Sequence, residues 1–168
     1  MLSQAQIQRV WEGMLAAEIR ALYFADLAAR YNARQAKATW ATLVLSSGAV
    51  VSLLAALPEE YALWVRLALT VTTVIVSAYS LAAQIQKRAL EASDLHERWH
   101  RVAAEYQAIW ENVGALDAFE RLQKVDNTVA ELSTASHQIP YRERLMRKWQ
   151  VRVQAEWKQR TAPERRAA

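Results

Sequence analysis

The chain has 168 residues and a formal net charge of +4, with only three glycines, three prolines and no cysteine. So few helix-breaking residues, and no run that alternates apolar with polar residues over the length of a strand, predict an all-α fold. The lack of cysteine excludes disulfides and thiolate metal sites, and no apolar core precedes a small-residue cleavage site near the start, so we predict no secretory signal peptide.

Residues 1–37 are predicted to form a cytoplasmic amphipathic helix. Ser3 is suited to cap its beginning. No proline or glycine pair interrupts the chain before residue 38, so we expect this helix to continue into the next segment. Its apolar positions recur at helical spacing: Ile7, Val10, Trp11, Met14, Ala21, Ala25 and Ala28.

Two stretches, 38–57 and 67–86, contain no charged residue. At about 1.5 Å of rise per residue, each helix would reach roughly 30 Å, the thickness of the hydrocarbon core of a bilayer. The sequence PEEY at 58–61 ends the first helix with a proline and places two glutamates in water. We therefore predict a transmembrane hairpin over 38–86, with an outer loop at 58–61; a soluble bundle with two fully buried helices is the alternative.

Basic residues close to the two predicted spans set the orientation of the hairpin. Arg30, Arg34 and Lys37 precede the first span, and Lys87 and Arg88 follow the second, while the outer loop at 58–61 has no Lys or Arg. Arg66 is the exception, and near the outer end of its helix it can extend to the headgroups. Because Lys and Arg are retained on the cytoplasmic side, we expect both termini to be cytoplasmic.

The second predicted span carries a regular line of polar residues. Steps of three and four place them on one face of a helix: Thr70, Thr73, Ser77, Ser80, Gln84 and Lys87. Polar side chains at membrane depth commonly face a bundle interior or a watery path, so we interpret these six as candidate pore-lining residues, with Lys87 at the cytoplasmic mouth. The alternative is that the small hydroxylated residues pack against a neighbouring helix.

Residues 87–160 are predicted to form a cytoplasmic helical region, followed by a disordered tail at 161–168. This region contains three apolar stripes that can pair with one another. The first lies within 95–113, the second is a short heptad-like coiled-coil pattern at 122–132, and the third belongs to a last helix at 141–157. Such stripes bury one another within one chain or between chains. The candidate oligomerisation stripe is Leu95, Trp99, Val102, Tyr106, Ile109 and Val113.

The charges of this region are segregated. Residues 141–168 hold nine basic and three acidic residues, whereas residues 91–131 hold nine acidic and four basic ones. The basic last helix is thus suited either to an anionic lipid surface or to the acidic helices of its own chain. Because this helix starts near a membrane, we expect it to contact lipid or the chain's own helices, and we do not expect nucleic acid as a partner.

The sequence HERWH at 96–100 satisfies the H-E-x-x-H pattern of zinc proteases. A catalytic zinc also needs a third protein ligand, and Arg98 would add positive charge beside the metal. We therefore interpret His96 and His100 as two polar residues that flank the apolar stripe. With no glycine-rich phosphate loop either, we predict no enzymatic activity, no metal and no cofactor.

Three segments resemble the SLATT family of bacterial two-transmembrane effectors. They are YFADLAARYNARQAKATW before the first span (23–40), HRVAAEY after the second (100–106) and HQIPYRERL near the end (137–145). The layout of an amphipathic helix, a tight hairpin and a cytoplasmic helical extension resembles that family over roughly residues 10–158.

The resemblance implies an oligomeric effector in the bacterial inner membrane. Members are proposed to form pores in nucleotide-signalled, anti-phage conflict systems and so to cause growth arrest or death of the cell. We expect no fused sensor domain, so the resemblance implies a separate sensor or nucleotide-synthase protein as partner, besides the lipid membrane and further copies of the chain. The competing hypothesis is a non-conducting scaffold whose cytoplasmic helices recruit a partner.

Overall fold

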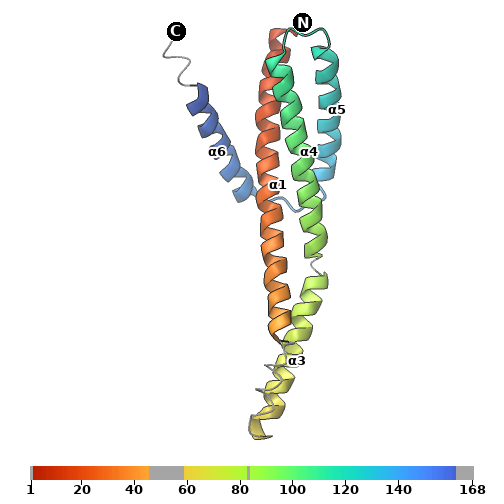
Figure 1. Cartoon of the computed structure of the whole chain (residues 1–168), viewed down its shortest axis with the longest axis vertical. Coiled ribbons are helices and arrows are strands. Elements are labelled where there is room, and N and C mark those ends of the chain that lie inside the picture. The colour runs from red at the N-terminus through yellow and green to blue at the C-terminus, as the bar shows by residue number, and fades with distance from the viewer. Residues whose placement is uncertain (1, 46–58, 83, 162–168) are drawn as a thin grey trace. The chain divides into compact units, whose positions relative to one another are not determined.

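The computed structural model describes residues 2–45, 59–82 and 84–161, and in these ranges the chain is all-α, as predicted. Figure 1 shows the five helices and their order along the chain. They are α1 (Gln4–Leu45), α3 (Glu59–Ala82), α4 (Ile85–Glu111), α5 (Ala118–Ser136) and α6 (Glu143–Thr161).

The chain divides into two compact units. Unit 1 comprises Met1–Leu27 and Glu91–Ala168, and unit 2 comprises Ala28–Leu90. Both boundaries between the units fall inside helices, so α1 and α4 each contribute residues to both units. Helix α1 is 42 residues long. The prediction that the N-terminal helix continues into the first uncharged stretch is therefore confirmed as far as Leu45; residues 46–57 of that stretch lie outside the described residues.

The first helix begins where the sequence predicts it. The backbone N–H of Ser3 donates to Oε1 of Gln6 (2.7 Å), and the backbone N–H of Gln6 donates to Oγ of Ser3 (3.4 Å). This reciprocal pair is a capping box, which satisfies two backbone donors that the first turn of a helix leaves without partners.

Three helices of unit 1 form a bundle in which α4 runs antiparallel to both α1 and α5 (Figure 1). Near one end of the bundle the rings of Trp11 and Trp110 lie 5.3 Å apart, and further along Nδ1 of His96 lies 2.8 Å from the carbonyl oxygen of Ala21. The core side chains come from all three helices and include Val10, Met14, Leu27, Leu95, Trp99, Val102, Tyr106, Ile109, Leu122, Val125 and Leu132.

The basic helix α6 packs against α1. One carboxylate oxygen of Asp26 accepts from Lys148 Nζ (2.9 Å) and from Trp149 Nε1 (3.3 Å), and Glu18 accepts from Trp157 Nε1 (2.6 Å). The sequence left two partners open for this helix, anionic lipid or the acidic helices of the chain. In the structure two acidic residues of α1, Glu18 and Asp26, are among its partners.

In unit 2, helix α3 begins at Glu59, inside the predicted outer loop, and ends at Ala82. Gln84, between α3 and α4, has a positive φ of 44°, so it is not in a right-handed helix. No helix in the described ranges combines the length and the apolar character that crossing a membrane requires.

Candidate functional site

The predicted polar line lies on α3 as far as that helix extends. Thr70 is exposed, Thr73 and Ser77 are half-buried, and the side chain of Ser80 lies outside the described part. The hydroxyl of Thr70 donates to the carbonyl oxygen of Arg66 (2.9 Å), and that of Thr73 donates to the carbonyl oxygen of Leu69 (2.8 Å). These hydroxyl protons are satisfied inside the helix, which leaves the oxygen lone pairs available to water or to a neighbour.

The other two predicted lining residues are not on α3. Gln84 lies between the helices with its positive φ, and Lys87 is an exposed residue in the first turn of α4. The expectation that one uninterrupted helix carries the line from Thr70 to Lys87 is therefore wrong beyond Ala82. The physical reason is local, because a residue in left-handed conformation breaks the helical phase that the spacing argument assumes.

Large apolar side chains cover a broad face of α3 and are exposed. Leu63, at the start of this face, is 68% exposed, and Ile75, further along, is 61% exposed. By helical periodicity this face adjoins the line of Thr70, Thr73 and Ser77, because Leu63 lies two turns before Thr70 and Val74 lies one turn after it. We call it the α3 apolar face, and its members are Leu63, Trp64, Leu67, Val71, Val74, Ile75 and Tyr79.

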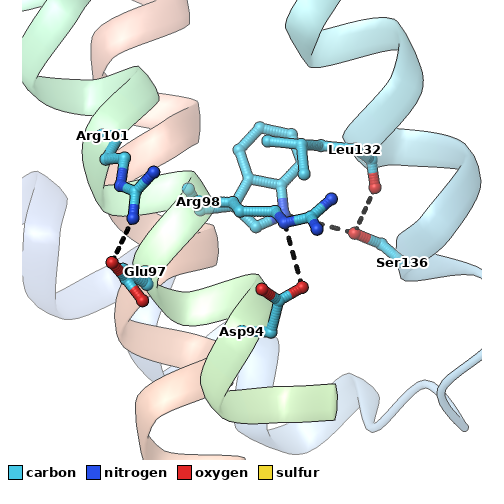
Figure 2. Close-up of polar contacts among 7 residues, drawn as sticks. Asp94, Glu97, Arg98, Arg101, Leu132 and Ser136 are labelled. Carbon is cyan, nitrogen blue, oxygen red and sulfur yellow. Dashed lines mark hydrogen bonds and ion pairs between the residues drawn. The ribbon is translucent and has the colours of Figure 1, made fainter.

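The H-E-x-x-H segment lies on α4, and its charged residues pair with neighbours one turn away. Figure 2 shows Arg98 directed at Asp94 and Arg101 directed at Glu97. The hydrogen bond from Arg101 is the main reason that the pKa of Glu97 lies below its ordinary value. A carboxylate whose pKa is lowered by an arginine is a weaker general base for hydrolysis near neutral pH.

The two histidines of this segment do not converge on a shared centre with other ligands. Their rings lie 6.1 Å apart, and Nδ1 of His96 contacts the Ala21 carbonyl oxygen. Because a carbonyl oxygen only accepts, this contact assigns the proton to Nδ1. In the ranges that the structure describes, no group of three or more His, Asp or Glu side chains is placed to hold a metal ion.

The predicted oligomerisation stripe is covered within the chain itself. Trp99 and Ile109 are each 1% exposed, and Leu95, Val102 and Tyr106 are also buried. Val113 lies beyond the end of α4 and is half-buried. Five of the six residues therefore belong to the core of the unit 1 bundle and are not exposed on the surface of this chain.

The bundle also holds a polar network that the stripe pattern did not predict. Tyr106 Oη donates to Oδ1 of Asp126 (2.9 Å), and Arg9 pairs with Oδ2 of the same carboxylate (2.9 Å). Burial and the hydrogen bond to Asp126 raise the pKa of Tyr106 far above its ordinary value. The network joins α1, α4 and α5, because each helix supplies one member. Spacing within any one helix carries no signal of it.

Comparisons of the chain with protein-family models, with curated proteins and with solved structures find no match.

Proposed function

We propose that the chain is a membrane-anchored, homo-oligomeric effector in which the segment 38–86 forms a hairpin in the bacterial inner membrane, with both termini cytoplasmic. Several copies would bring their α3 helices together around a pore, since two helices per chain do not enclose a channel. This is the function that the resemblance to the SLATT family implies, and it places the chain in anti-phage defence through membrane disruption.

The observation that carries the proposal is the α3 apolar face. Unit 1 buries its large apolar stripes, whereas α3 exposes seven large apolar residues on one side. A large set of exposed apolar side chains on one side of a helix is typical of a surface that protein or membrane covers. The polar line runs along one edge of this face, so the same helix offers an apolar side to lipid and, beside it, a polar strip to the interior of a bundle.

The mechanism that follows is a passive one. Thr70, Thr73 and Ser77 would present oxygen lone pairs to water and ions, while the α3 apolar face turns toward lipid. Gln84 and Lys87, beyond the end of α3, would lie near the cytoplasmic entrance rather than along the wall of the pore. The cytoplasmic unit would hold the copies together or receive the trigger from a separate sensor or nucleotide-synthase protein.

Conductance of the purified, size-defined oligomer in planar bilayers tests this function. We expect discrete current steps from the parent chain and at least a tenfold loss of current from the double variant Thr73→Leu/Ser77→Leu, because leucine removes oxygen from the line. Thr72→Leu is the matched control, since Thr72 also donates to its own helix (Ala68 O, 2.7 Å) but lies off the line. Parent-like current from the double variant would contradict pore lining by this face.

The second candidate function is a non-conducting scaffold. Thr73 and Ser77 are half-buried in the single chain, and this favours the scaffold. Residues that a neighbouring helix of the same chain already covers contribute to helix packing and do not line a water-filled path. A correctly inserted oligomer that passes no current, while its cytoplasmic helices still bind a partner, would support the scaffold over the pore.

A further inference from the structure

Unit 1 contains a cavity of about 540 Å³ lined by α1, α4, the end of α5, the segment that follows it, and α6. The volume lies in the range of small-molecule sites, and such sites in helical proteins form between the helices of a bundle. Ile19, Arg20 and Tyr23 of α1 line one side, and Tyr141 and Met146 line another. All the lining residues belong to unit 1, so this cavity is independent of the membrane role proposed above.

Arg20 supplies a cation inside this cavity. Its guanidinium carbon lies 4.6 Å from the centre of the Trp99 ring, within the range of a cation–π contact. Trp99 is itself fixed, because its Nε1 donates to Oγ of Ser136 (3.2 Å) and Ser136 donates to the carbonyl oxygen of Leu132 (2.7 Å). Figure 2 shows the positions of Ser136 and Leu132 on α5. The guanidinium plane is therefore held by a rigid support.

The guanidinium lacks a carboxylate within the described residues. Ion pairs of the described part involve other basic side chains, for example Arg9, Arg98 and Lys148. No side-chain nitrogen or oxygen of the described part is buried without a hydrogen-bond partner, so the donors of Arg20 are accessible rather than sealed in protein. Partial desolvation lowers the pKa of Arg20, which means that its charge lacks full solvation. An anion in the cavity would supply the missing partner.

The rest of the cavity is suited to an apolar, ring-bearing body. Tyr23 and Phe24 pack edge to face at 5.0 Å, and the Tyr23 and Tyr141 rings lie 6.3 Å apart. Tyr23 is oriented by its hydroxyl, which accepts the backbone N–H of Arg142 (3.1 Å). Tyr141 is 66% exposed and stands at the edge of the cavity. Tyr23 itself is 2% exposed and supports the Tyr141 ring from behind. A single guanidinium beside one accessible aromatic ring suits a ligand with one carboxylate and one ring.

We propose that this cavity binds a small aromatic carboxylate, with the carboxylate on the Arg20 guanidinium and the ring against Tyr141 and Met146. A planar carboxylate accepts two parallel hydrogen bonds from a guanidinium. Because Met146 and Gln150 of α6 also line the cavity, a bound ligand would tie α6 to α1 more firmly.

Isothermal titration calorimetry tests this site, with 1-naphthoate as the probe and the full-length chain in a non-ionic detergent. We expect saturable binding of 1-naphthoate, at least tenfold weaker binding of the neutral 1-naphthalenemethanol, and a smaller loss with Arg20→Lys than with Arg20→Gln. Empty micelles give the blank for partition of the probe into detergent. Arg101→Gln is the matched control, because it removes an exposed arginine of the same unit that does not line this cavity.

A second variant keeps the proposal falsifiable if Arg20→Gln fails to fold. Tyr141→Ala changes an exposed ring outside the helices, so it should fold like the parent and weaken 1-naphthoate several-fold. The proposal is overturned if folded Arg20→Gln binds 1-naphthoate as the parent does. It is equally overturned if the parent shows no saturable heat, or if the neutral alcohol binds as tightly as the carboxylate.

Discussion

At the level of single residues, Gly13 packs tightly against Tyr106. A Cβ atom at Gly13 would lie 2.6 Å from Cζ of Tyr106, closer than two carbon atoms approach without displacement. The ring has little freedom to move away, because Tyr106 is buried and its hydroxyl is bound to Asp126. A glycine inside a helix normally lowers helix stability, so close packing explains its presence here.

We therefore expect Gly13→Ala to destabilise the chain, although alanine is the better helix former by about 1 kcal/mol. Displacing a buried, hydrogen-bonded ring should cost about 1–3 kcal/mol net in the free energy of unfolding, measured by chemical denaturation. Gly114→Ala is the control, because nothing lies within 4 Å of its added Cβ, and it should be neutral or slightly stabilising. Equal effects at both sites would show that the contact with Tyr106 is not tight.

The raised pKa of Tyr106 predicts a pH dependence of stability. The folded chain holds the phenolic proton more tightly than the unfolded chain, whose tyrosines titrate near pH 10. This contribution is therefore fully present below pH 10 and is lost as pH rises above it, with a slope of up to about 1.4 kcal/mol per pH unit. Tyr106→Phe should flatten the decline of unfolding free energy above pH 10, and a decline as steep as in the parent would contradict the assignment.

At the scale of elements, α6 depends on a few polar contacts with α1. Asp26 is the centre of these contacts, because it accepts from both Lys148 and Trp149. Asp26→Ala should loosen α6 selectively and speed amide hydrogen exchange in α6 by about tenfold, while exchange in α4 and α5 stays unchanged. Glu156→Ala, which removes only an exposed pair with Arg152 inside α6, should have little effect. Uniform acceleration across the bundle would indicate global destabilisation instead.

The boundaries of the elements were predictable where a local signal exists. Ser3 and Gln6 begin α1 with a capping box, and the absence of proline allowed the helix to run on to Leu45. The break at Gln84 had no such signal, because glutamine seldom adopts a positive φ and no glycine or proline marks the position. The helical line predicted through Gln84 failed for that reason.

At the level of the whole molecule, the helical spacing of apolar residues predicted which residues are buried, but it did not predict which helices they pack against. The stripe on α4 has the same period whether its partner is another helix of this chain or a second copy, and the structure buries it within unit 1. The cavity at Arg20 was not predictable either. It depends on the passage of residues 137–142 and α6 beside α1, a long-range arrangement that leaves no periodic trace in the sequence.

The proposed function requires that α3 lies in a membrane with its apolar face toward lipid. Because the chain has no cysteine, single cysteines placed at Ser3, Glu59 or Ile75 can be tested with a membrane-impermeant maleimide on bacterial cells. We predict that Glu59→Cys reacts in intact cells, that Ser3→Cys reacts only after permeabilisation, and that Ile75→Cys stays protected in both until detergent dissolves the membrane. Reaction of Ile75→Cys as fast as Ser3→Cys in permeabilised cells would contradict the claim, because it would place the α3 apolar face in water.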